Sequence, residues 1–437
     1  MADDKRCELR ERLSLWDAGD AWLLQQGLLH TLVKSIVIFV SGDIIIYKTQ
    51  EKLVAARLLF TNAGNAPGNN LARSLRAGAG SPFIVGCNDD QFALKKSDAD
   101  RNYVIPPADH PEWSEVLRWI MKTERLDLII PTIDADVEHL SRERKKLGEY
   151  LFLPSTSVLD LCRDKYRLIA MLRRNGIDAP ASYPVRDLKQ VTKIFQQLKG
   201  GRPLWCRVRS GAGALGALPV RTPEQARSWI RYWKEMRGVP VTAFVLSEYL
   251  PGRDFGCQSV WKDGKLVLIK TYERLSYIGM GSQPAQVSSV AALAKTVVEA
   301  KVVDTCVRAI KLLDAKVSGV FSVDLKEDAR GIPCITEIGV GRFSSATNIF
   351  DLVGKHNMAK TFVQLARGAP VKIEDSYDAV LDWYMLRDLD GPPRIFHASQ
   401  FSDNIVNTWQ GAASGRGRLK ATERGKSGWR TFKSTRR

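Results

Sequence analysis

A glycine-rich stretch of the chain has the composition of a loop that binds phosphate. Residues 209–216 read RSGAGALG, and the last six letters fit G-x-G-x-x-G, the pattern of a dinucleotide-binding turn. That turn runs from a strand into a helix, whereas residues 203–208 and 217–221 both read as strands here. We therefore interpret the loop as a hairpin connection, which disfavours a nicotinamide- or flavin-dependent oxidoreductase.

Two arginines give this loop a chemical interpretation. Arg207 lies just before the loop and Arg209 opens it. A basic, glycine-rich flap can wrap phosphate groups with its backbone N–H groups, and guanidinium groups add charge-assisted hydrogen bonds. A plain flexible hairpin is the alternative that the residues alone leave open.

Two carboxylates further along the chain are spaced so that they can share a pocket. Residues 319–326 and 333–339 read as strands joined by a short turn. Alternation along the first strand puts Asp324 on the face opposite Phe321 and Val323. Glu337 lies on the adjacent strand, so the two carboxylates can converge. Ordinary solvated strand carboxylates are the alternative.

Composition indicates a globular α/β protein. The 437 residues suggest two or three domains, and 44% of them are hydrophobic. The seven cysteines are dispersed and no two have C-x-x-C spacing, which argues against a zinc or redox site and is typical of reduced cytoplasmic thiols. The apolar stretch 35–48 is too short to cross a membrane and reads as a strand or strand pair.

Strand and helix patterns alternate along the chain. In the first part they predict a small parallel sheet, with strands at 57–61, 82–87 and 126–131 and helices at 69–78 and 111–123. In the second part they predict helices at 160–175, 222–233 and 289–313, a strand at 243–250, and a hairpin of 256–261 and 266–272.

The last residues are strongly basic. Residues 411–437 carry nine Lys or Arg and one acid, so they hold +8 of the net charge of +17. Because the segment is rich in Gly, Ser and Thr, we expect it to be disordered. It is either an arm for nucleic acid or an acidic partner, or a solubilising extension. We favour the extension, since nothing in the segment sets a specific geometry.

The ordered set of these features resembles the ATP-grasp superfamily, and most closely the synthetase halves of the carbamoyl-phosphate synthase large chain. The resemblance covers residues 57–370. It rests on the leading α/β domain, on Asp164-Lys165, and on the basic residue before the glycine flap. It also rests on EYLPGRD at 248–254 and on the carboxylate pair that ends at Glu337.

The resemblance implies an α/β fold in which a Rossmann-like pre-ATP-grasp domain precedes a two-subdomain ATP-grasp fold. We expect the former at 57–152 and the latter at 153–370. Residues 1–56 form an extension of unclear role. A C-terminal segment at 371–410 is expected to pack on the core before the basic tail at 411–437.

The resemblance also implies ATP and Mg²⁺ (or Mn²⁺) as cofactors, with defined residues around the nucleotide. Lys165 resembles the basic residue that reaches the nucleotide from the linker helix, and Arg207 the one that contacts the α-phosphate. The flap over the triphosphate corresponds to Ser210, Gly211, Gly213 and Gly216. The remaining positions are the hinge residues Glu248, Tyr249 and Leu250, whose backbone pairs with the adenine edge, and Asp254, which holds the ribose hydroxyls.

Asp324 and Glu337 resemble the magnesium ligands of the superfamily, and one departure lies beside them. The superfamily commonly has Asn two positions after the second acid, where this chain has Gly339. Either water or Asn348 takes the place of that ligand, or the metal is held less tightly. Arg342 either faces the acyl phosphate or the substrate carboxylate as a catalytic residue, or is a surface arginine.

We therefore expect an ATP-dependent ligase that activates a carboxylate as an acyl phosphate for attack by an amine or another nucleophile. The alternative is a non-catalytic nucleotide-binding protein whose basic tail engages a partner. The partners we expect are small-molecule substrates and no membrane, in the cytoplasm, with a homodimer left open. Because the chain resembles one synthetase half and carbamoyl-phosphate synthase has two, we do not expect it to make carbamoyl phosphate alone.

Overall fold

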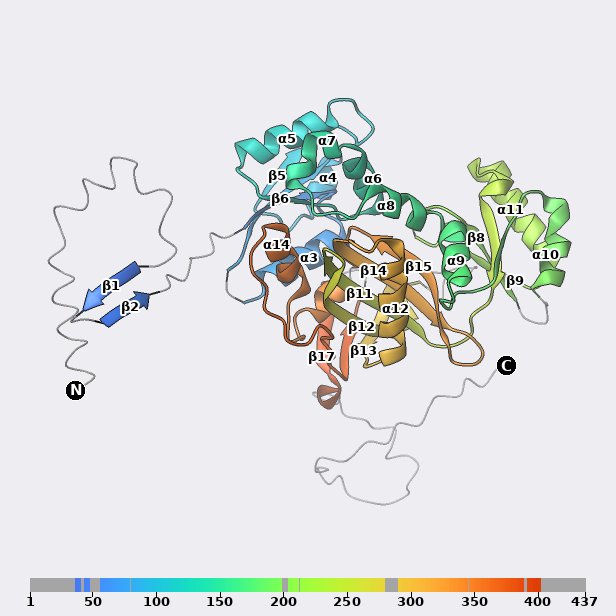
Figure 1. Cartoon of the computed structure of the whole chain (residues 1–437). Helices are drawn as coiled ribbons and strands as arrows, with labels where there is room; N and C mark the ends of the chain where they lie inside the picture. The colour runs from blue at the N-terminus through green and yellow to red at the C-terminus, as the bar shows by residue number, and fades with distance from the viewer. Residues whose placement is uncertain are drawn as a thin grey trace, which may run out of the picture. The chain divides into compact units, whose positions relative to one another are not determined.

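The computed structural model describes residues 36–40, 43–47, 56–78, 80–198, 203–211, 213–279, 290–344, 346–388 and 391–401. The chain divides into two compact units, Met1–Phe152 with Ala359–Val371, and Leu153–Met358 with Lys372–Arg437 (Figure 1). The expected basic tail at 411–437 lies outside the described residues. Within the described ranges, no helix is both long and apolar enough to cross a membrane.

The first unit contains a parallel sheet of four strands in the order β5-β4-β3-β6. Its strands are β3 (Arg57–Thr61), β4 (Phe83–Asn88), β5 (Arg101–Val104) and β6 (Leu128–Ile130). Its helices are α3 (Ala66–Arg76), α4 (Gln91–Leu94), α5 (Trp113–Thr123), α6 (Asp134–Arg142), α7 (Arg144–Leu147), η1 (Gly148–Tyr150) and α14 (Met358–Ala366). The predicted parallel sheet is therefore confirmed.

The stretch at 35–48 was expected to form a strand or a strand pair, and the structure has the strand pair there. The antiparallel strands are β1 (Ile36–Val40) and β2 (Asp43–Tyr47).

The second unit begins with two helices and a small antiparallel sheet in the order β7-β10-β8-β9. The elements are α8 (Thr156–Arg163), α9 (Lys165–Arg174), β7 (Ser182–Pro184), η2 (Leu188–Gln190), α10 (Val191–Gln197), β8 (Leu204–Val208), β9 (Leu218–Val220), α11 (Pro223–Arg237), η3 (Val241–Ala243) and β10 (Phe244–Glu248). Apolar residues of α10 and α11 pack on this sheet around Phe244.

The larger sheet of the second unit has seven antiparallel strands in the order β15-β14-β11-β12-β13-β16-β17. Its elements are β11 (Asp254–Lys262), β12 (Lys265–Tyr277), β13 (Ala291–Thr296), α12 (Ala300–Leu313), β14 (Gly319–Glu327), β15 (Pro333–Val340), α13 (Thr347–Phe350), β16 (Trp383–Leu386), β17 (Arg394–His397) and η4 (Ala398–Gln400). Helices α8, α9 and α12 bury one face of the sheet around Trp261 and Phe321. The opposite face carries the charged residues Asp324 and Arg274 and, beside them, an apolar cluster of Tyr272, Ala294 and Met385 with Phe350.

Two predicted helices were wrong in their extent. The single helix expected at 289–313 is strand β13 followed by α12, because pairing with β12 and β16 overrides the helix propensity of the Ala-rich start. The helix expected at 160–175 is interrupted at Asp164. The Asp164 carboxylate accepts hydrogen bonds from the backbone of Tyr166 and Arg167, so it caps a new helix instead of continuing the old one.

Candidate functional site

The glycine-rich loop is a hairpin connection, as its flanking strands predicted. Strand β8 pairs with β9 in antiparallel register on either side of it. Gly213 and Gly216 have φ values of 71° and 61°, in the left-handed region that favours glycine. A Cβ on Gly216 would lie 2.8 Å from Val208 Cγ2, so a larger residue would also clash there. These constraints fix the base of the flap.

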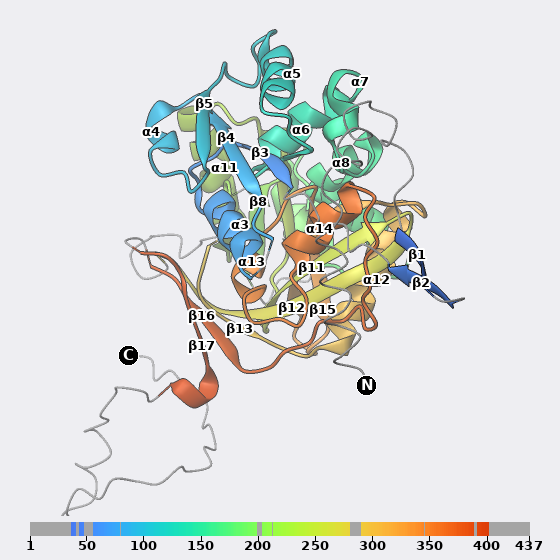
Figure 2. The same ribbon diagram turned by 90° about the vertical axis from the view of Figure 1, so that its left-hand side faces the viewer.

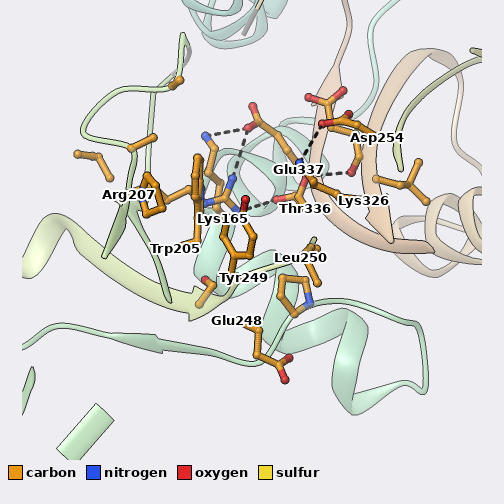
Figure 3. Close-up of a pocket in the computed structure, with 18 of the residues that line it drawn as sticks. Lys165, Trp205, Arg207, Glu248, Tyr249, Leu250, Asp254, Lys326, Thr336 and Glu337 are labelled. Atoms are coloured by element: carbon orange, nitrogen blue, oxygen red, sulfur yellow. Dashed lines mark hydrogen bonds and ion pairs between the residues drawn. The ribbon is translucent and has the colours of Figure 1, made fainter. Parts of the chain in front are cut away.

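Two buried cations meet one carboxylate beneath the flap. Lys165 begins α9, and its Nζ lies 3.4 Å from Glu337 Oε2 and donates to the carbonyl of Gly211 at 2.6 Å. Arg207 comes from β8, and its Nη1 lies 3.9 Å from the same Glu337 oxygen. Figure 3 shows both side chains converging on Glu337. The structure thus joins the linker helix, the flap and the large sheet through one charged cluster.

The guanidinium of Arg207 is only partly satisfied by the protein. Its Nη2 donates to the carbonyl of Thr336 at 2.7 Å, while its buried Nε has no hydrogen-bond partner among the described residues. Burial lowers the pKa of this guanidinium, against the opposing influence of Glu337 and Asp324. A buried donor without a partner is costly, so an anionic ligand at this point is physically favoured.

Asp324 and Glu337 lie directly opposite each other on β14 and β15, so the predicted convergence is confirmed. Gly339 pairs with Ser322 two positions further along the same two strands. Its φ is not positive, and a Cβ there would lie 3.6 Å from Ser322 Cβ, an ordinary contact. The Gly339 position can therefore hold a side chain without strain, and glycine is not demanded by the backbone. The side chain of Asn348, the alternative ligand, lies outside the described residues.

The expected hinge residues Glu248, Tyr249 and Leu250 lie at the end of β10, whose last residue is Glu248. The carboxylate of Glu248 turns away from the charged cluster and accepts from the backbone N–H of Ala181 at 2.7 Å (Figure 3). The Tyr249 ring lies 6.4 Å from the Trp205 ring, measured between centroids. Because the Glu248 side chain is already used within the protein, the hinge presents backbone groups and apolar surface to a ligand.

Arg274 is a central residue that the motifs did not reveal. It lies on β12, and its Nη1 donates to Asp254 Oδ1 at 2.9 Å while its Nη2 binds Asp324. Burial alone would lower the pKa of this guanidinium, but the nearby Asp324, Tyr272 and Asp254 outweigh it and the pKa rises. Asp254 also accepts a hydrogen bond from the Tyr277 hydroxyl. One guanidinium therefore links the acid expected at the ribose to an acid expected at the metal.

These groups surround a cavity of about 370 Å³ within the second unit, a size typical of small-molecule sites. Nine of the residues expected at the site line it: Lys165, Arg207, Gly211, Glu248, Tyr249, Leu250, Asp254, Asp324 and Glu337. Ser210, Gly213, Gly216 and Arg342 are described residues that do not line it. The carbonyl of Arg342 accepts from Gln258 Nε2 at 3.4 Å, just after the end of β15.

The cavity fits a nucleotide with a divalent cation. Lys165 and the incompletely paired Arg207 supply positive charge for phosphates, and Asp324 and Glu337 supply carboxylate oxygens. Across the described residues, no group of three or more His, Cys, Asp or Glu side chains could hold a metal unaided. Mg²⁺ is usually bound by one or two carboxylates together with substrate phosphates, so this pair suits a metal that arrives with the nucleotide.

Comparisons with known proteins agree with this architecture, although no family model matches the sequence. A "Probable alpha-L-glutamate ligase" of Cellvibrio japonicus is 28% identical over 245 residues, which are 52% of this chain and 75% of that protein. The biotin carboxylase domain of 2-oxoglutarate carboxylase from Hydrogenobacter thermophilus, solved with MgADP and bicarbonate, superposes with a TM-score of 0.58. It is 16% identical and covers 75% of this chain and 73% of its own.

A third similar protein is the L-amino acid ligase of Bacillus licheniformis. Its structure superposes with a TM-score of 0.57 at 14% identity, over 76% of this chain and 78% of its own. The chain has the ATP-grasp fold, and the expected fold class is confirmed: a parallel α/β unit and the two antiparallel sheets of an ATP-grasp fold.

Proposed function

We propose that the protein is an ATP-dependent ligase that joins a carboxylate to an amine. A carboxylate oxygen of the substrate attacks the γ-phosphorus of ATP, the bond to the β–γ bridging oxygen breaks, and ADP leaves. The amine nitrogen then attacks the acyl carbon, phosphate leaves with the electron pair of the C–O bond, and the nitrogen loses a proton. Such a reaction needs positioning and charge stabilisation rather than a nucleophilic side chain.

The observation that carries the proposal is the cluster of Lys165, Arg207 and Glu337 beneath the flap. Both cations are buried, with side chains 8% and 11% exposed, and both point at a carboxylate that lies opposite Asp324. Cations beside paired carboxylates form the arrangement that phosphoryl transfer requires, since the triphosphate needs both fixed positive charge and a metal. The names of the similar proteins, two of them ligases, support the same chemistry.

Each group in the cavity has a role under this proposal. Lys165 and Arg207 bind phosphate oxygens, and the flap from Ser210 to Gly216 covers them with backbone N–H groups. The hinge binds the adenine edge. Asp254 keeps acceptor capacity for ribose hydroxyls. A carboxylate offers about four lone-pair sites. Among the described residues, the carboxylate of Asp254 accepts hydrogen bonds only from Arg274 and Tyr277.

Asp324 and Glu337 would hold Mg²⁺, which supplies charge neutralisation between the β- and γ-phosphates when it is bound. Arg274, held by Asp254 and Asp324, faces the same end of the cavity. Its guanidinium is placed to orient an anionic oxygen of the carboxylate substrate. Arg342 remains a candidate for the same task from the loop after β15.

We propose further that the chain is of the carbamoyl-phosphate synthase-like kind by descent, with a different reaction. It resembles one synthetase half, whereas carbamoyl-phosphate synthase has two. The similarity of order and motifs between residues 57 and 370 supports this subtype.

Two measurements test the proposal. Calorimetry with MgATP and with NADH should show binding of the first alone, and binding of NADH alone would refute the nucleotide assignment. A screen of carboxylates paired with amines should then show ADP release that depends on both substrates. Tight binding of ATP without turnover across the screen would favour a non-catalytic nucleotide-binding protein instead.

A further inference from the structure

The first arm of the flap is fastened to the start of helix α9. The backbone N–H of Lys165 donates to the carbonyl of Arg209 at 3.0 Å, and Lys165 Nζ donates to the carbonyl of Gly211 at 2.6 Å. The guanidinium of Arg209 lies over the ring of Tyr166, 5.2 Å from its centre. Consecutive residues at the start of α9 therefore contact the chain where it enters the flap.

Asp164, the residue before this helix, adds an ion pair to these contacts. Its Oδ1 lies 3.2 Å from Arg209 Nε and its Oδ2 lies 2.5 Å from Arg209 Nη2. Both side chains are mostly buried, with Asp164 19% and Arg209 26% exposed. Pairing at two points fixes orientation as well as distance, because a guanidinium and a carboxylate are both planar.

Neither member of the ion pair faces the proposed nucleotide site. Asp164 and Arg209, which both belong to the described ranges, do not line the cavity, whereas their neighbours Lys165 and Gly211 do. Asp164 also accepts hydrogen bonds from two backbone N–H groups in the first turn of α9, at 3.0 and 3.1 Å, and so caps that helix. One carboxylate therefore sets both where α9 begins and where the first arm of the flap lies.

The second arm of the flap is held by a different helix. Helix α11 packs on the small sheet around β8, the strand that leads into the flap (Figure 2). Trp229 on α11 donates its indole N–H to the carbonyl of Gly216 at 2.9 Å. Helix α9 instead packs on the large sheet. The Asp164–Arg209 ion pair thus joins the flap to the part of the unit that carries the two carboxylates.

We propose that Asp164 and Arg209 are positioning residues, which together hold the flap over the phosphates of the nucleotide. Without their ion pair, the first arm of the flap moves away from the cavity, while Trp229 keeps the second arm in place. Arg209 then acts indirectly, in place of the direct phosphate contact that its position in the sequence left open. This inference rests on the proposed function, because it takes the cavity as the nucleotide site.

Asp164→Asn tests the ion pair without removing the helix cap, because asparagine caps a helix about as well as aspartate. Arg209→Gln removes the same ion pair from the other side. Hydrogen-exchange mass spectrometry of the full chain without nucleotide should show about tenfold faster exchange in peptides that cover residues 210–216 in both variants.

Isothermal titration of the same proteins separates a flap effect from a general one. Both variants should bind MgADP about tenfold more weakly than wild type, the effect of losing one charge-assisted hydrogen bond. Both should bind AMP within twofold of wild type, because AMP has no phosphate beyond the first for the flap to cover. The double variant should be no weaker than either single variant, since each substitution breaks the same contact.

Asp160→Asn on α8 and Arg167→Gln on α9 are the matched controls, because both are exposed residues of the same charge types. They should change neither measurement, and thermal melting should show that every variant folds. Unchanged flap exchange or unchanged MgADP affinity in folded Asp164→Asn would overturn this inference and leave the proposed ligase intact. Equal weakening of MgADP and AMP would also overturn it. A wild-type protein that binds neither nucleotide would refute the nucleotide site itself, and this inference with it.

Discussion

Replacing Arg207 tests the nucleotide site at the point where the structure is most specific. Arg207→Ala removes a guanidinium that donates to the Thr336 carbonyl at 2.7 Å and has a buried Nε without a hydrogen-bond partner in the described ranges. If that unused donor faces a phosphate, the variant loses one charge-assisted hydrogen bond to the nucleotide. Such a bond contributes about 1.5–3 kcal/mol, which corresponds to a Kd about 10- to 150-fold weaker.

The same substitution should leave the protein folded. Glu337 keeps Lys165 as a partner at 3.4 Å, so no carboxylate is stranded without a cation. The Thr336 carbonyl loses a donor, at a cost of about 1–3 kcal/mol, but removing a buried charge relieves part of its desolvation penalty. We therefore expect only a small decrease in melting temperature.

Isothermal titration with MgADP measures the effect, and two variants calibrate it. Arg207→Lys keeps the charge but loses the fork, so its affinity should lie between those of wild type and Arg207→Ala. Arg308→Ala removes a half-exposed arginine from α12 in the same unit and should leave the affinity for MgADP unchanged. A folded Arg207→Ala that binds MgADP within twofold of wild type would show that Arg207 does not contact the phosphates.

Three further predictions follow, two from the second unit and one from the first. Glu337→Gln should lower ADP release by orders of magnitude while changing nucleotide affinity much less, because a metal ligand acts mainly on the transferring phosphate. Gly339→Asn should lower the Mg²⁺ concentration needed for half-maximal turnover without reducing the melting temperature, since its Cβ would be 3.6 Å from Ser322 Cβ. Burial raises the pKa of Asp136 to about 6, so the folded state retains a proton that the unfolded state releases near pH 4. Stability should therefore fall by about 2–3 kcal/mol as the pH rises from 4 to 6, and urea denaturation should show this loss in wild type but not in Asp136→Asn.

Each of these predictions has a clear contrary result. Unchanged ADP release in Glu337→Gln would end its assignment as a metal ligand, and Glu327→Gln at the end of β14 provides the control for loss of an acid. An unchanged Mg²⁺ requirement in folded Gly339→Asn would show that the added amide does not reach the metal. Parallel pH profiles for wild type and Asp136→Asn would show that Asp136 is ionised over this range.

Arg274 shows why part of the site was hidden from the sequence. The two-residue turn at Asp263 and Gly264 would place Asp254 opposite Glu273 if the hairpin were regular. A bulge between Val260 and Trp261 shifts the register, and Asp254 instead pairs with Arg274. A shift of one residue exchanges the two faces of a strand, so this irregularity brings the guanidinium to the cavity.

The carboxylate pair depends on a similar irregularity. Glu327 pairs with Pro333 and Leu325 with Ile335, a register that would set Asp324 opposite Thr336. A bulge between Asp324 and Leu325 moves Glu337 into that place. The prediction that these acids converge was confirmed, but thirteen residues of separation do not by themselves establish it.

Local patterns in the sequence determined the elements and the chemistry of their ends: the hairpin around the glycine flap, the helix that starts after Thr222, and the individual strands and helices of the first unit. These features depend on interactions within a few residues, such as alternation, capping and turn conformation. Only the tertiary structure decided that Ala291–Thr296 is a strand and that Arg274 lies between Asp254 and Asp324. Strand order, bulges and register arise from pairing energies between segments up to about a hundred residues apart, and a window of sequence does not contain them.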